Sequence, residues 1–66
     1  MISFTIESAR FPDGTVREQR VSGHVLPRIG EFVDCKEFCG YVKNVLHDYT
    51  QSKAGATIVT ILVRLV

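Results

Sequence analysis

The residues best suited to chemistry in this chain are its two cysteines, Cys35 and Cys39, which lie in the segment DCKEFCG. They could hold a metal, close a disulfide or pack as small apolar side chains. A zinc site would need His24 and His47 as further ligands, but a Cys-x₃-Cys pair with one histidine on either side matches no standard zinc pattern. We therefore expect no metal and no other cofactor, and we interpret both cysteines as packed thiols.

Whether Cys35 and Cys39 can form a disulfide depends on the local structure. If both lie on one strand, their Cα atoms are about 13 Å apart, whereas a disulfide joins Cα atoms within roughly 7 Å. A tight loop at residues 36–38 would bring them face to face across a hairpin, and a helix would place them on one face. A catalytic thiol would also need a base positioned beside it. Neither histidine stands out from the sequence as such a base, so we expect a protein that is not an enzyme.

The length and charge of the chain limit the classes of function. With 66 residues it is expected to form one domain, 1–66, with a small core. Its 8 basic and 7 acidic residues give a net charge of +1, far from the basic character of a typical nucleic-acid-binding domain. The longest apolar tract, residues 57–66, is too short to cross a bilayer and contains Arg64, and no signal peptide is visible after Met1. We expect a cytoplasmic protein without membrane contact.

Alternating apolar and polar residues predict a chain made mainly of strands. Ile2, Phe4 and Ile6 point to one side of the first strand. The sequence PDGT at 12–15 predicts a hairpin turn, because proline, aspartate and glycine each favour turn conformations. The predicted strands cover residues 2–11, 15–25, 31–33, 39–49 and 56–66.

Residues 34–49 allow two interpretations. As a helix they would place seven side chains on one face at a spacing of 3.6 residues, namely Cys35, Phe38, Cys39, Val42, Val45, Leu46 and Tyr49. Gly40 in the middle of that helix would cost about 1 kcal/mol relative to alanine, and its neighbours favour a strand. We favour a strand over 39–49, whose irregular alternation indicates a bulge or a bend. The predicted fold is all-β, a small five-stranded SH3-like barrel or roll, and the alternative is α+β with one helix at 35–49.

The segment LPRIGEFV at 26–33, followed by GYVKNVLHDY and TIVTILV, resembles a group of short, mostly uncharacterised bacterial and phage proteins. Those proteins carry a Leu-Pro-Arg-hydrophobic-Gly-Glu segment, then a Val-x-x-Val-x-His strand and a β-rich C-terminal strand, and the group is similar to SH3-like small β-barrels. The matching residues here are Leu26, Pro27, Arg28, Gly30, Glu31, Val42, Val45 and His47. The resemblance covers residues 25–66 and implies a fold more than an activity. The segment DCKEFC departs from the pattern, because it is longer and richer in cysteine than the turn expected there.

The prediction of function rests on the C-terminal strand. Both faces of residues 56–66 are largely apolar, and so small a chain can cover only one of them. We therefore predict a non-catalytic protein-interaction module that self-associates as a homo-oligomer, a role suited to an accessory protein of a phage or mobile element. Its protein partner beyond a second copy is unknown. The candidate interaction surface consists of Arg17, Arg20, Arg28, Tyr41, Lys43, Ile58, Leu62 and Val66.

The alternative function is a small β-barrel that binds nucleic acid. Such barrels combine a basic face with aromatic side chains on which bases stack. Tyr41, Tyr49 and Phe11 could supply the stacking here, but acidic residues interrupt the basic set at Glu18, Glu31 and Asp48. We therefore favour a solvated surface of mixed charge over a nucleic-acid interface.

Overall fold

The computed structural model describes residues 2–23 and 25–66, which form five strands. The strands are β1 (Ile2–Glu7), β2 (Glu18–Gly23), β3 (Phe32–Asp34), β4 (Cys39–Gln51) and β5 (Thr57–Leu65). The described residues contain no helix, so the all-β prediction is confirmed and the alternative helix at 35–49 is wrong. The β propensity of that segment, together with Gly40, outweighs its helical spacing of apolar residues.

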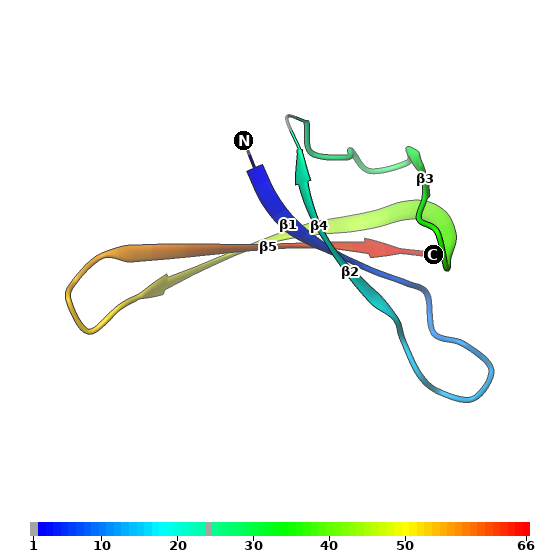
Figure 1. Ribbon diagram of the computed structural model, residues 1–66, viewed down its shortest axis with the longest axis horizontal. Coiled ribbons are helices and arrows are strands. Elements are labelled where there is room, and N and C mark those ends of the chain that lie inside the picture. The colour runs from blue at the N-terminus through cyan, green and yellow to red at the C-terminus, as the bar shows by residue number, and fades with distance from the viewer. Residues whose placement is uncertain (1, 24) are drawn as a thin grey trace.

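The strands form one curled sheet in the order β2-β1-β5-β4-β3 (Figure 1). β1 runs parallel to β5, with Thr5 opposite Leu62, and all other neighbouring strands are antiparallel. The β1–β2 hairpin crosses the long β4–β5 hairpin steeply, which gives the sheet the shape of a half-barrel (Figure 1). β2 and β3 are the two edges of this sheet.

The first hairpin has the predicted turn but shorter strands than predicted. The amide of Gly14 donates to the carbonyl of Phe11 at 2.9 Å, and Gly14 has a φ of 88°, which glycine adopts without strain. The strands end early because the Ser8 hydroxyl, rather than a strand carbonyl, accepts the amide of Arg17 at 2.8 Å. Residues 8–17 therefore form a loop with its own hydrogen bonds, and the predicted strands 2–11 and 15–25 are too long. The end of the predicted return strand at His24 lies outside the described residues.

β4 contains the predicted irregularity. Val42 is opposite Leu65 and Asn44 is opposite Arg64, so Lys43 is an extra residue that makes a β-bulge. Two residues earlier in the strand than Val42, Gly40 lies so close to β5 that a side chain would collide with it. A Cβ atom at Gly40 would sit 2.6 Å from the carbonyl oxygen of Val66 and 3.3 Å from the Cβ atom of Leu65.

The core lies on one face of the sheet and is small. Its buried members are Phe4, Ile6, Cys35, Val42, Val63 and Leu65, and half-buried side chains such as Val45 and Ile61 pack against them. We refer to this side as the core face and to the opposite side as the outer face. None of the six buried residues comes from residues 46–60, which form the far part of the β4–β5 hairpin and project from the sheet (Figure 1). We call residues 46–60 the arm.

The arm ends in a turn built like the first one. Gly55 has a φ of 85° and donates its amide to the carbonyl of Ser52 at 2.9 Å. The Ser52 hydroxyl accepts the amide of Ala56 at 3.1 Å. Along the arm β4 and β5 pair only with each other, because β3 pairs with residues 39–41 of β4 and β1 pairs with residues 62–64 of β5.

Candidate functional site

The two cysteines lie in different surroundings and do not face each other. Asp34 is opposite Cys39 in the β3–β4 hairpin, and the amide of Cys35 donates to the carbonyl of Phe38 at 2.8 Å, so residues 35–38 connect the strands and Cys35 is level with Phe38 rather than with Cys39. Cys35 is buried in the core, Cys39 is exposed, and both are free thiols. Burial raises the pKa of the Cys35 thiol, and the nearby charge of Asp34 adds to the effect. The cross-hairpin arrangement in which the two cysteines would be opposite is therefore wrong.

The described part of the chain brings no metal-binding set together. Across residues 2–23 and 25–66, no group of three or more His, Cys, Asp and Glu side chains could hold a metal ion. His47 is exposed and lies opposite Ile61 at the base of the arm. His24, the other ligand considered for a zinc site, lies outside the described residues. A site built from the cysteines would therefore have one buried and one exposed sulfur, without a further described ligand beside them.

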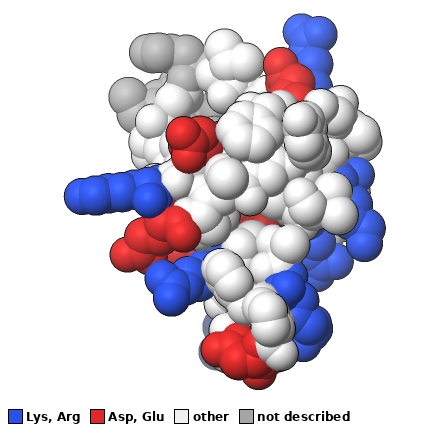
Figure 2. Space-filling model, turned by 90° about the vertical axis from the view of Figure 1, so that its right-hand side faces the viewer, with Lys and Arg blue, Asp and Glu red and all other residues white. Residues whose placement is uncertain are grey.

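Tyr41 and Val66 of the predicted surface lie together at one end of the molecule. Their backbones exchange two hydrogen bonds, at 3.2 and 2.8 Å, and the Tyr41 ring packs edge-on against Phe32 with ring centroids 5.2 Å apart. All three side chains are more than half exposed, at 56% for Phe32 and Tyr41 and 66% for Val66. Seen from the end that carries β3 and the C-terminus, uncharged side chains occupy the middle of the surface and charged ones of both signs surround it (Figure 2). Phe32, Tyr41 and Val66 therefore form an exposed apolar cluster at this end of the molecule.

Ile58 and Leu62 lie on the outer face of the β4–β5 hairpin. Ile58 is opposite Thr50, and Leu62 is opposite Leu46. On the other side of the same ribbon, Tyr49 is opposite Val59. Leu62, just outside the arm, is half-buried, whereas the large apolar side chains of the arm are exposed by 40–67%, namely those of Leu46, Tyr49, Ile58 and Val59. The arm therefore presents apolar side chains on both of its faces.

The three predicted arginines do not gather into one surface. Arg17 lies over the ring of Phe11, with its guanidinium carbon 5.4 Å from the ring centre, and forms an exposed ion pair with Glu37 at 3.3 Å. Arg20 lies on the edge strand β2, opposite Thr5. Arg28 begins the turn at Gly30, where its amide donates to the carboxylate of Glu31. These residues belong to different segments and share no described contact.

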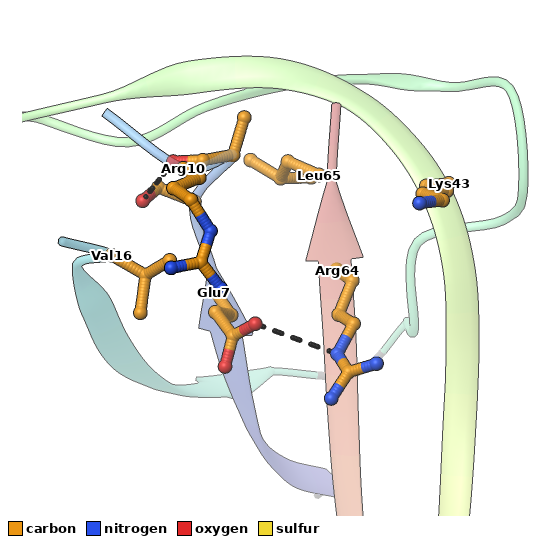
Figure 3. A pocket seen from close by; sticks show the side chains of 8 residues that line it. Glu7, Arg10, Val16, Lys43, Arg64 and Leu65 are labelled. Carbon is orange, nitrogen blue, oxygen red and sulfur yellow. Dashed lines mark hydrogen bonds and ion pairs between the residues drawn. The ribbon is translucent and has the colours of Figure 1, made fainter. Parts of the chain in front are cut away.

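Lys43 belongs instead to a hollow beside β5 (Figure 3). The hollow has a volume of about 280 Å³ and is lined by Glu7, Ser8, Ala9, Arg10, Val16, Lys43, Arg64 and Leu65. Its charged members come from β1, from the loop after it, from β4 and from β5. The Nε atom of Arg64 lies 3.4 Å from Oε1 of Glu7. We call this feature the basic hollow.

Sequence reasoning missed several members of these surfaces. Leu46 and Val59 could have been found by assuming an antiparallel hairpin with its turn at SKAG. That hairpin pairs Leu46 with Leu62 and Tyr49 with Val59. The sequence predicts a strand at Phe32, but the pairing of β3 with β4 determines that Tyr41 is its partner. Arg10 carries no sequence signal, because a loop residue is brought to the hollow only by tertiary structure.

The comparisons with known proteins add no relative. Within the described residues, no helix is long and apolar enough to cross a membrane. No protein-family model, no curated protein and no solved structure matches this chain.

Proposed function

We propose that this protein is a non-catalytic interaction module that self-associates through its arm. The observation that carries the proposal is the exposure of Leu46, Tyr49, Ile58 and Val59 on a ribbon that contributes nothing to the buried core. Clusters of exposed apolar side chains of this kind mark interaction surfaces in small soluble proteins. The short proteins that the sequence resembles include phage proteins, so we propose an accessory role in a phage or mobile element.

The energetics favour pairing of two arms over docking of one arm on a polar surface, which would add no apolar area of its own. Fully burying a large apolar side chain stabilises by about 1.5–3 kcal/mol. Since the four side chains of one arm are about half exposed, their burial would supply roughly 3–6 kcal/mol. Association costs an estimated 4–15 kcal/mol, so the burial of one arm alone offsets this cost only at the low end of that range. Two arms packed symmetrically would supply roughly twice as much, and closed twofold pairing is the most common arrangement of homo-oligomers.

The free edges of the arm support the same arrangement. Outside the β4–β5 pairing, the described residues give the backbone of residues 46–60 no strand partner. An exposed apolar strand with unpaired amides and carbonyls can pair with another strand. Charges that would discourage such pairing are few along this stretch, namely Asp48 and Lys53.

The test is the mass of the protein in solution. Size-exclusion chromatography with light scattering is expected to show a dimer or larger species that dissociates on dilution. The double variant Ile58→Thr/Val59→Thr removes apolar surface on both faces of the arm but keeps β-branched residues, so it is expected to be monomeric and folded. Val25→Thr is the matched control, because Val25 is also highly exposed but lies in the loop after β2, and it should behave as the wild type. A wild-type protein that stays monomeric at high micromolar concentration contradicts the proposal.

A further inference from the structure

The basic hollow holds three cationic side chains and one carboxylate. Arg10, Lys43 and Arg64 line it together with Glu7, which leaves an excess of two positive charges (Figure 3). Among the described residues, Arg64 pairs with Glu7, whereas neither Arg10 nor Lys43 forms an ion pair. Like charges placed side by side destabilise a fold unless an opposite charge offsets them. The hollow therefore has the electrostatic character of a site for an anion.

Two of the cations are held in place by the protein itself. Arg10 donates from Nη1 to the carbonyl of Gly14 at 2.9 Å, which ties its side chain to the turn of the first hairpin. Arg64 is oriented by its ion pair with Glu7, whose own side chain is only 21% exposed. The Ser8 hydroxyl, which lines the same hollow, accepts the amide of Arg17 and donates to the carbonyl of Ala9, and so fixes the start of the loop. Such prior ordering reduces the loss of entropy on binding.

The third cation is brought to the hollow by the β-bulge. Because Val42 is opposite Leu65 and Asn44 is opposite Arg64, the extra residue Lys43 stands beside Arg64. Bulges turn a side chain away from the regular alternation and occur frequently next to functional sites. The lysine contributes a mobile point charge, whereas the arginines offer several directed N–H donors.

We propose that the basic hollow binds a phosphate group of a small molecule, such as a phosphomonoester or a diphosphate. A phosphate dianion matches the excess of two positive charges, and its oxygens accept hydrogen bonds from guanidinium and ammonium groups at once. The volume of about 280 Å³ is large enough for the phosphate and a small attached group. This binding site is separate from the arm, so it does not depend on self-association.

The proposal is tested by NMR titration of the whole protein with sodium pyrophosphate, in a buffer free of phosphate. Saturable shifts are expected at the amides of residues 7–10, 43–44 and 64. Lys43→Gln and Arg10→Gln should each weaken binding about tenfold, since each removes one charge-assisted contact. Lys53→Gln removes the same charge at the tip of the arm and should leave the affinity unchanged. The amide spectrum of each variant shows whether it remains folded.

Three outcomes would overturn the assignment. The first is the absence of saturation at millimolar pyrophosphate. The second is equal affinity in Lys43→Gln, Arg10→Gln and Lys53→Gln, which would indicate general attraction to positive charge. The third is a single-stranded oligonucleotide that binds while pyrophosphate does not, with shifts spread over Arg17, Arg20 and Arg28. That pattern would assign the phosphate contacts to a polynucleotide.

Discussion

At the scale of single residues, burial gives the two cysteines different chemical reactivity. Cys35 packs in the core beside Val42 and Leu65, whereas Cys39 at the start of β4 is exposed. Thiolate is the reactive form of cysteine, and the raised pKa of Cys35 keeps it protonated over a wider pH range than an exposed thiol. Burial and the raised pKa therefore both protect Cys35 from thiol reagents.

We therefore predict that thiol reagents modify Cys39 long before Cys35. At mildly alkaline pH, one thiol per chain should react rapidly with a chromogenic disulfide reagent, and the second only as the core opens. Cys39→Ser should abolish the rapid phase, and Cys35→Ser should leave it unchanged. Two thiols that react at the same rate in the folded protein would contradict the burial of Cys35.

Of the five glycines, only Gly40 lies so close to another strand that a side chain would collide with it. A Cβ atom there would meet the carbonyl oxygen of Val66 at 2.6 Å, and this contact is with backbone rather than with a flexible side chain. Gly40→Ala is therefore expected to lower the free energy of unfolding by about 1–3 kcal/mol, measured by urea titration followed by circular dichroism.

Gly23→Ala is the matched control for this substitution. Gly23 is the last residue of β2, but no atom outside its chain neighbours lies within 4 Å of its Cβ position, and its φ is not positive. Its replacement should be neutral or stabilise the protein by about 0.5 kcal/mol, because alanine is less flexible in the unfolded chain. If both variants unfold at the same urea concentration, the close approach of Gly40 to β5 is not rigid.

At the scale of elements, the β4–β5 hairpin combines two parts with different roles. Its base supplies Val42, Val63 and Leu65 to the core, and its arm supplies exposed apolar side chains. The turn at the tip is specified locally, since Ser52 caps the loop and Gly55 adopts a positive φ. The arm can therefore form from its own sequence, whereas the base is stabilised by β1.

We predict that the arm can be shortened without unfolding the protein. His47 is opposite Ile61, so replacing residues 48–60 with the two-residue turn Asn-Gly would join them in a tight hairpin. The shortened protein retains every buried residue of the core and should give a dispersed amide spectrum, while self-association is lost. Loss of folding in the shortened protein would show that the arm stabilises the single chain.

At the scale of the whole molecule, shape and charge explain why association is the proposed role. The chain extends over 41 × 27 × 18 Å, although only six apolar residues are buried among residues 2–23 and 25–66. A core of this size gives marginal stability in a domain of 66 residues, and a partner subunit is one of the usual sources of further stability. The net charge of +1 provides little repulsion against a second copy.

Sequence alone determined the features that depend on neighbouring residues. Alternation of side chains and turn residues predicted the first strand, the hairpin turn at 12–15 and the irregular strand at 39–49, because such signals act within a few residues. The same reasoning predicted strands over 2–11 and 15–25 that are too long, since the Ser8 hydroxyl accepts the amide of Arg17 and both residues lie in the loop between β1 and β2.

Only the tertiary structure decided which distant residues meet. The parallel pairing of β1 with β5 and the bulge at Lys43 bring Arg10, Lys43 and Arg64 to one hollow, although they are far apart in the chain. The pairing of β3 with β4 places Phe32 beside Tyr41, and the short pairing of β1 with β5 leaves the arm without a third strand beside it. Contacts of this kind depend on the register of whole strands and on the free energy of the packed sheet, and no local pattern encodes them.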